Sequence, residues 1–414
     1  ITALQQSLQL PGALTESQVN TNPHQAQNTT DWMDTRDTHT NLSMNSQVGD
    51  DWHYRSTLFY SDINHSGWEI SSYNNDDHQW KWHQQFTSDH THWLNSQWDA
   101  TSDLTRGDYH YQSDTYNTAS TQQITSAALQ SVTPLWQRTR VILGLRTTNN
   151  DQQAANQTNA WSNNQTALAN TQALEYRWGD NNTVKVQRAT SYRFPTTDEI
   201  AWTQNNQPLN TQTGTTYDIS TNIITDKTNL TLQGYDLLLN NEILYAPFND
   251  SLYFGYNENL PPTSRLGAML SLKQGITRST YLTVFYSIER ATIDEGSDKG
   301  NAIPFVPAVN WQATLKQDIF THWTASVNYR YIGSRYPLGD TSNIGIKSPG
   351  VGLVNMALRY QRHAWATTLS INNLLNQQYD EASVLTVDTQ GNPNTVYYPA
   401  AGIQVLFSGH YLFD

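Results

Sequence analysis

The chain has 414 residues, of which 37% are hydrophobic and only 14% are charged, with a net charge of −13 and no cysteine. This composition excludes disulfides and thiolate metal sites, argues against nucleic-acid binding, and offers no apolar stretch of about 18 residues for a transmembrane helix. Trp (14) and Tyr (23) are nevertheless abundant. A polar, uncharged, aromatic-rich chain suits a wall between water and lipid, but also an Asn/Gln-rich aggregating chain, so composition leaves both open.

Segments with apolar residues at every second position recur along the chain. A period of two predicts strands and not helices. The clearest cases are LWQRTRVILGLRT (135–147), RLGAMLSLK (265–273), YLTVFYSIE (281–289) and WTASVNYRY (323–331). The second face of these segments carries Arg, Lys, Asn and Thr. That face therefore contacts water and not a dry core.

The links between these segments differ in length in a regular way. Short links near 48–50, 274–276 and 361–363 alternate with long polar segments near 11–33, 150–165, 195–213, 291–305, 334–349 and 377–400. Tight turns at one end and long loops at the other are typical of a transmembrane barrel, whereas a soluble sandwich has both lengths at both ends. We therefore predict an all-β fold: a transmembrane antiparallel up-and-down β-barrel with about 18 strands in this chain. Strand positions between 67 and 117 stay open, because alternation is weak there.

Two further features bear on the predicted barrel: the C-terminal segment and Arg188. Residues 403–413 alternate so that Ile403, Phe407, Tyr411 and Phe413 share a face, which predicts a closing barrel strand. Its last two aromatics would lie in the girdle at the periplasmic interface. Arg188 falls on the face that we assign to lipid, unless a bulge turns it inward.

Five motifs in the C-terminal half resemble, in the same order, those of TonB-dependent outer-membrane receptors. They are SYRFPTTDEI (191–200), GNAIPFVPAVNW (300–311), YIGSRY (331–336) with SPGVGLVNMALRY (348–360), INNLLNQQYD (371–380) and YYPAAGIQVLFSGHYLF (397–413). The segment LPGALTESQ…NPHQAQ (10–27) is similar to an extracellular loop of that family. Each motif alone is weak, but their common order is specific.

The resemblance implies a 22-stranded barrel with a plug domain and a segment that contacts TonB, in the outer membrane of a Gram-negative cell. Neither plug nor TonB segment is recognisable, and ITALQQSLQLPG at the start lacks the features of a signal peptide. We therefore expect residues 1–414 to be the barrel domain, with the N-terminal plug and the first strands not in this sequence. The alternative is a plugless passive pore. Expected partners are outer-membrane lipid, the TonB energy-transducing complex (through the plug) and a small-molecule ligand.

The resemblance further implies uptake of a scarce ligand, for which we favour a ferric siderophore. Haem, cobalamin, pyrroloquinoline quinone and oligosaccharides are the other candidates, and no intrinsic cofactor is expected. Aromatic rings would stack on the ligand and Arg would counter its charge. The candidate residues at the lumen mouth and in loops are Arg193, Phe194, Trp202, Tyr245, Tyr253, Arg335, Tyr336, Tyr397 and Tyr398. The plainer alternative is that they brace loops or belong to the upper aromatic girdle.

Other functions have less support in the sequence. There is no G-x-S-x-G, H-E-x-x-H or P-loop motif, so we predict that the chain is not an enzyme. His78 and His83 would point to opposite faces of a strand, whereas His90 and His92 would share one. A metal site would need a third ligand from elsewhere in the chain, and we predict no metal site. An adhesive surface protein remains an alternative because of the Gln/Asn-rich loops.

Overall fold

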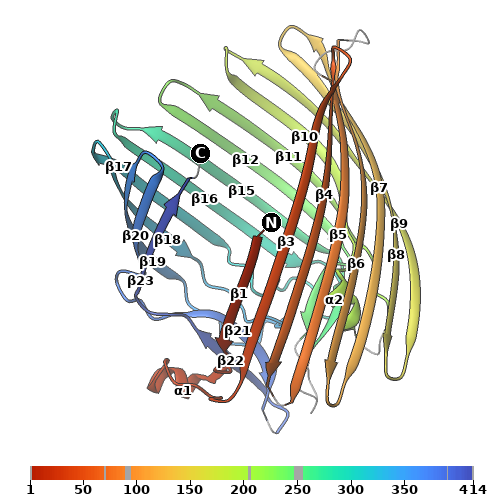
Figure 1. Cartoon of the computed structure of the whole chain (residues 1–414), viewed down its shortest axis with the longest axis vertical. Coiled ribbons are helices and arrows are strands. Elements are labelled where there is room, and N and C mark those ends of the chain that lie inside the picture. Colours follow the sequence, from red (N-terminus) through yellow and green to blue (C-terminus); the bar gives the residue numbers. More distant parts are fainter. Residues whose placement is uncertain are drawn as a thin grey trace.

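The computed structural model describes residues 2–69, 71–88, 95–203, 207–246, 255–388 and 390–412. Eighteen strands form one antiparallel sheet that curves around a central space (Figure 1), as the alternation predicted. In chain order they are β1 (Thr2–Gln9), β3 (Trp32–Val48), β4 (Trp52–Trp68), β5 (Ser72–Ser88), β6 (Gln97–Ser113), β7 (Asn117–Trp136), β8 (Thr139–Asn156), β9 (Ala160–Trp178), β10 (Asn182–Arg193), β11 (Gln212–Ile224), β12 (Thr228–Asn240), β15 (Thr263–Gly275), β16 (Thr280–Ile293), β17 (Val309–Phe320), β18 (Trp323–Ile332), β19 (Val351–Arg362), β20 (Trp365–Asn372) and β23 (Gln404–Tyr411). Each pairs with the next in this order, which is the up-and-down topology. Within the described residues no helix has the length and apolar character to span a bilayer.

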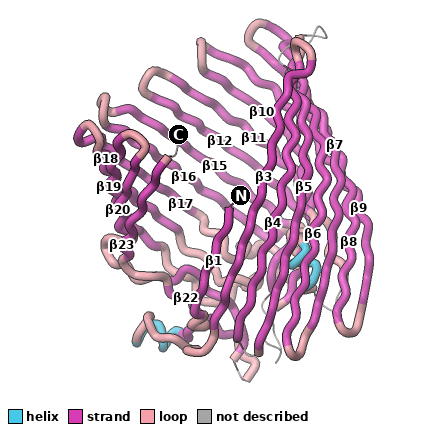
Figure 2. The backbone as a smooth tube through the Cα atoms, viewed as in Figure 1, coloured by secondary structure: helices cyan, strands magenta, loops and turns pink. Residues whose placement is uncertain are grey.

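The two ends of the sheet differ, as the link lengths predicted. One end, here the short-turn end, carries tight turns such as 225–227 and 363–364; the other, here the loop end, carries long links and lies lower in Figure 2. The links at the loop end contain the remaining elements. These are β2 (Leu14–Thr15), α1 (Glu16–Thr21), α2 (Thr197–Ala201), β13 (Ile243–Ala246), β14 (Tyr256–Asn259), β21 (Asp380–Val387) and β22 (Pro393–Pro399).

One predicted loop was wrong, and one uncertain region is settled. Residues 150–165 are not a long loop, because β8 and β9 run through them and are joined by residues 157–159 alone. These strand ends carry polar residues on both faces, so they show no apolar alternation. Between 67 and 117 the chain forms β5 and β6, which pair in continuous register.

Strand register separates an outer from an inner face. The outer face carries exposed apolar side chains such as Leu266 (64% exposed) and Phe407 (74%). At the short-turn end, ring pairs on this face join neighbouring strands: Trp323 with Tyr360 at 5.0 Å and Trp365 with Tyr411 at 4.7 Å between centroids. These pairs match the girdle that the alternation predicted; Phe413 lies outside the described residues.

Arg188 lies on the outer face without a bulge. The pairing of β10 with β9 and β11 is continuous through it, and it stands opposite Tyr217. Its guanidinium donates a hydrogen bond to Asn170 Oδ1 at 3.2 Å. The bulge that would turn Arg188 inward is therefore absent from the described β10.

The inner face is held together by polar groups. The buried carboxylate of Asp103 accepts hydrogen bonds from His83 Nδ1 (2.7 Å), Ser126 Oγ (3.0 Å) and Arg146 Nη2 (3.0 Å), and Lys81 Nζ lies 3.5 Å away. The four partners come from β5, β7 and β8, so one side chain of β6 ties three other strands together.

At each edge of the sheet, part of the backbone has no neighbouring strand on one side within the described residues. β1 pairs with β3 only from Trp32 to His39, which leaves residues 40–48 of β3 without a partner on that side. β23 was predicted to close the barrel, but within the described residues it pairs with β20 and not with β1. At the loop end the edges are tied through a small sheet, because β2, which follows β1, pairs with β22, which precedes β23.

Replacing Asp103 by Ala is expected to lower the free energy of unfolding by about 2 kcal/mol, because a buried acceptor of several cationic donors is lost while those donors stay partly solvated. Urea unfolding in detergent micelles, followed by tryptophan fluorescence, measures this. Asp108→Ala on the same strand is the control: its partner Arg106 is 50% exposed, so the loss should not exceed about 1 kcal/mol. Equal losses for both variants would contradict the assignment.

Candidate ligand-binding mouth

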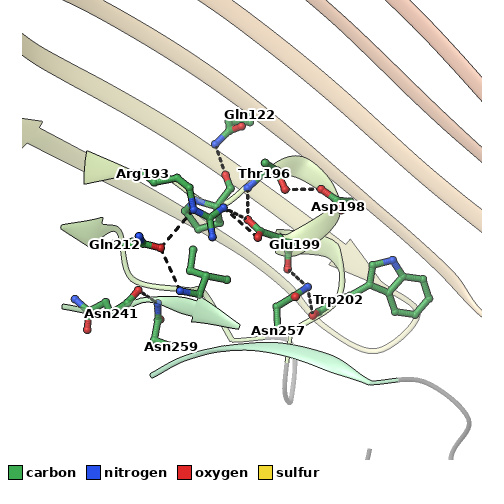
Figure 3. Close-up of polar contacts among 12 residues, drawn as sticks. Gln122, Arg193, Thr196, Asp198, Glu199, Trp202, Gln212, Asn241, Asn257 and Asn259 are labelled. Atoms are coloured by element: carbon green, nitrogen blue, oxygen red, sulfur yellow. Dashed lines mark hydrogen bonds and ion pairs between the residues drawn. The ribbon is translucent and has the colours of Figure 1, made fainter. Parts of the chain in front are cut away.

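The link after β10 begins with a local structure that its sequence dictates. Pro195 disfavours helix at the preceding residue, so β10 ends before it. Thr196 and Glu199 then form a capping box at the start of α2. Thr196 N donates to Glu199 Oε2 at 2.9 Å, and the same carboxylate receives Arg193 Nη1 at 2.7 and 3.0 Å (Figure 3). Arg193 thus fixes α2 to the end of β10.

The first part of this link (the whole link is residues 194–211) folds against the inner face of β7. Gln122 Nε2 donates to the carbonyl of Pro195 at 2.8 Å, and Ser120 Oγ donates to the carbonyl of Thr197. Ile200 is completely buried. The wall therefore supplies the hydrogen bonds that the carbonyls of the link would otherwise take from water.

Two wall amides beside these contacts lack partners. Asn150 and Gln152 on β8 are 0% and 1% exposed, and Gln152 stands opposite Gln122 in the strand pairing. Both polar atoms of each amide have no hydrogen-bond partner among the described residues. Burying amide groups without partners costs free energy, so these two residues lower the stability of this part of the inner wall.

The link 194–211 is clasped to the next long link, residues 241–262. Asn257 of β14 donates to the carbonyl of Trp202 from its backbone N at 2.7 Å and from Nδ2 at 3.1 Å. Asn259 and Asn210 exchange two further hydrogen bonds. Figure 3 shows the contact of Asn257 with Trp202 near the pair of Arg193 and Glu199. The two links therefore move as one unit or must first break these bonds.

Trp202 joins an aromatic cluster on the inner face at the loop end. Its ring stacks on Tyr116 at 5.2 Å and meets Tyr111 edge-on at 5.0 Å between centroids, and Tyr111 stacks on Tyr73 at 5.9 Å. Trp202 Nε1 donates to the hydroxyl of Tyr109 at 3.1 Å. Stacked rings of this kind offer flat surfaces for a planar ligand.

The links 294–308, 333–350 and 373–403 form a second group. The Arg335 guanidinium lies 4.4 Å from the centroid of Phe305 and donates to the carbonyl of Glu381 at 2.7 Å. Burial lowers the pKa of Arg335, and the charge of Arg330 lowers it further. Lys347 Nζ lies 4.3 Å from the centroid of Tyr336. Both cations therefore contact rings of their own chain.

A backbone hydrogen bond joins the two groups of links: Asp294 N donates to the carbonyl of Pro262 at 2.8 Å. Burial raises the pKa of Tyr398, and the nearby groups Tyr245 and Glu69 raise it further. Burial also raises the pKa of the Glu69 carboxyl, with Asp31 as the second cause. The electrostatic environment of Tyr398 therefore includes groups from other links of the loop end.

The structure describes eight of the nine predicted site residues, and their environments differ. Phe194 and Tyr397 are buried, and Arg193, Arg335 and Tyr336 already have intramolecular partners. Tyr245 and Tyr398 are 41% and 45% exposed, and Tyr253 lies outside the described residues. Trp202 is part of the aromatic cluster, whose other members sequence reasoning missed: Tyr73, Tyr109, Tyr111 and Tyr116. Tyr109 and Tyr111, two apart in the sequence, were the available signal.

His78 and His83 lie on opposite faces of β5, as their spacing predicted. His78 is on the outer face beside Asp62, at 3.1 Å, and His83 is on the inner face beside Asp103. His90 and His92 lie outside the described residues. No group of three or more His, Asp or Glu side chains placed to hold a metal ion occurs in the described part of the chain.

The net charge of the chain is concentrated at the loop end. The links 10–31, 69–71, 114–116, 157–159, 194–211, 241–262, 294–308, 333–350 and 373–403 contain 16 carboxylates and three basic residues. The rest of the chain contains 20 of each. The loop end therefore carries the whole surplus of 13 negative charges, and the barrel wall with its short turns is neutral.

Comparison with known proteins places this geometry in context. The family model described as "TonB dependent receptor-like, beta-barrel" matches residues 3–374. No curated protein matches the chain.

Similar solved structures include the ferric-catecholate import receptor Fiu from K12 E. coli in its closed form (TM-score 0.77, 13% identity, 99% of this chain and 71% of that one). The siderophore receptor PiuA from Acinetobacter baumannii (0.75, 14%, 92% and 65%) and the ferric citrate transporter FecA without ligand (0.77, 13%, 99% and 66%) are also similar. The chain spans about two thirds of the length of these receptors; identities this low show a shared fold alone.

Arg193→Gln is expected to loosen α2, because Glu199 keeps its capping contact but loses its cation. Amides of residues 196–202 should exchange with deuterium about fivefold faster, as for loss of a partly exposed ion pair. Asp198→Asn, on the same helix turn, leaves the pair intact and should change exchange less. The same acceleration in both variants would show that Arg193 does not hold the helix.

Proposed function

The chain belongs to the TonB-dependent receptor family, and on this premise we propose that it forms the barrel of an outer-membrane receptor for a scarce small ligand, favouring a ferric siderophore. The family and the similar structures are transport receptors and not enzymes. Outer-membrane location is implied by the family. Support comes from the outer apolar face, from the polar inner wall and from the two long links that lie over one end of that wall.

The negative charge of the loop end limits the charge that the ligand can carry, and the proposed ligand class rests on this observation. A surplus of 13 carboxylates around the mouth attracts cations and repels anions over a distance of about 10 Å at ordinary ionic strength. Three cations at the loop end, Arg193, Arg335 and Lys347, already contact groups of the chain. We therefore favour a ferric chelate that is neutral or cationic over a polyanionic catecholate complex.

The aromatic cluster sets a second requirement. Trp202 and Tyr111 offer ring surfaces but few free hydrogen-bond donors, so a ligand with a flat or apolar face suits them better than a small hydrated ion. A haem, cobalamin or pyrroloquinoline quinone receptor meets this requirement too. An open passive pore fits less well, because residues 194–203 cover part of the inner wall.

We further propose that the working barrel has additional strands and a plug, encoded N-terminal to residues 1–414. Unpaired backbone groups are costly in hydrocarbon, and the free edges of β3 and β23 lie beside apolar side chains such as Leu42 and Phe407. Pairing of these edges with further strands would remove that cost. The β2–β22 contact would then hold the loop end around the completed barrel. TonB would act on the plug.

The ligand charge can be tested by the salt dependence of binding. With the complete, plug-containing protein, a cationic ferric hydroxamate should bind several-fold more weakly when ionic strength rises from about 0.01 to 0.15 M, because the Debye length falls from about 30 to 8 Å. A neutral hydroxamate complex should change little, and a polyanionic ferric catecholate should bind weakly at low salt. Tightest binding of the catecholate at low salt would overturn the charge assignment, but not the receptor proposal.

The missing strands can be tested by hydrogen exchange. In the complete protein the amides of residues 40–48 and of Gln404–Tyr411 should be protected, whereas in a refolded chain of residues 1–414 they should exchange rapidly, because their outer partners are absent. β16, which pairs on both sides, is the control and should be protected in both. Rapid exchange of both edges in the complete protein would contradict the proposal.

A further inference from the structure

Five neighbouring strands carry a regular pattern on their outer face. They are β10, β11, β12, β15 and β16, which lie side by side in Figure 1. Directly paired residues form rows across them. Two successive rows are almost wholly apolar: Val184, Thr221, Leu232, Leu270 and Tyr286; then Val186, Ile219, Gly234, Ala268 and Ile288.

These two rows form a groove. Its volume is about 570 Å³, and its lining includes Trp178, Val184, Ile219, Leu232 and Tyr286. The floor of the groove is low at Gly234 because this residue has no side chain. A Cβ at that position would meet only Ile219 Cγ2, at 3.9 Å. The groove is therefore a shallow apolar channel in the lipid-facing surface, made by a missing side chain between large neighbours.

The next row toward the loop end is charged. It consists of Arg188, Tyr217, Asp236, Leu266 and Arg290, and it is followed by the mostly polar row Thr190, Thr215, Leu238, Ser264 and Thr292. The charged row is thus the boundary between the apolar band and the water-facing part of the outer face. Lipid headgroups lie at such a boundary.

The two arginines of this row have no carboxylate partner. Among the described residues Arg188 contacts only the Asn170 amide, and Arg290 has no hydrogen bond or ion pair. An unpaired guanidinium facing lipid is costly unless it reaches an anion at the interface. With Asp236 between them, the row carries one net positive charge, although the links above it are acidic.

We propose that this surface binds an anionic lipid, with one acyl chain in the groove and the phosphate of its headgroup on Arg188. The groove is continuous with the apolar band that faces the bilayer, and its cationic rim lies on its loop-end side, where a lipid of that leaflet has its headgroup. A zwitterionic lipid would fill the groove but would gain less at the rim. The binding is independent of the transported ligand.

Three substitutions test the site: two should weaken the retention of lipid and one should strengthen it. Arg188→Gln should weaken retention of phosphatidylglycerol about fivefold, the usual contribution of one basic residue near an anionic membrane surface. Gly234→Leu should fill the groove and reduce retention of phosphatidylglycerol and phosphatidylcholine alike. Asp236→Asn should strengthen retention of phosphatidylglycerol, because the rim becomes more positive. The measurement is native mass spectrometry of the complete protein, released from detergent after titration with each lipid.

Matched controls come from the same outer face. Arg106→Gln removes an arginine that is paired with Asp108, and Gly409→Leu fills open space on β23; neither should alter lipid retention. Unchanged thermal unfolding of each variant confirms the fold. Equal retention of both lipids by the wild type, an unchanged Arg188→Gln variant, or a second protein copy in place of lipid would each overturn the proposal.

Discussion

The structure depends on one constraint: backbone amides and carbonyls that face hydrocarbon must find partners within the sheet. Strands paired on both sides meet it, and the pairing fixes which side chains face lipid and which face the interior. The constraint also explains why the edges matter. Residues 40–48 and β23 have a free side, and the contact between β2 and β22 joins the two edges only where water can satisfy free groups.

The inner wall meets the same constraint in a different way. Polar side chains of β7 donate to carbonyls of the link 194–211, and Asp103 gathers donors from three strands. The exception is the pair of unpartnered amides at Asn150 and Gln152. The Arg193–Glu199 pair and the hydrogen bonds from Asn257 to Trp202 add to the contacts that hold the link.

The sequence predicted the fold better than the site. Alternation and ordered motifs indicated the barrel and about 18 strands, because lipid on one face and water on the other impose a period of two. The signal failed where both faces are wet, as in the polar ends of β8 and β9. At the mouth, Arg193 stays a predicted ligand contact, and its partner within the chain is Glu199, six residues on. The capping box was visible in the sequence; the meeting of Trp202 with Tyr111 and Tyr116 was not, because it joins distant segments.

Charge is distributed according to the solvent that each part meets. The wall and short turns are neutral with 20 charges of each sign, whereas the loop-end links hold the surplus of 13 carboxylates. The links above the groove, residues 194–211, 241–262 and 294–308, contain eight acidic residues and one lysine. An anionic headgroup beneath them would be repelled within one Debye length. Arg188 and Arg290 stand between these links and the apolar band, and so supply the positive charge that an anionic leaflet needs to approach this side of the barrel.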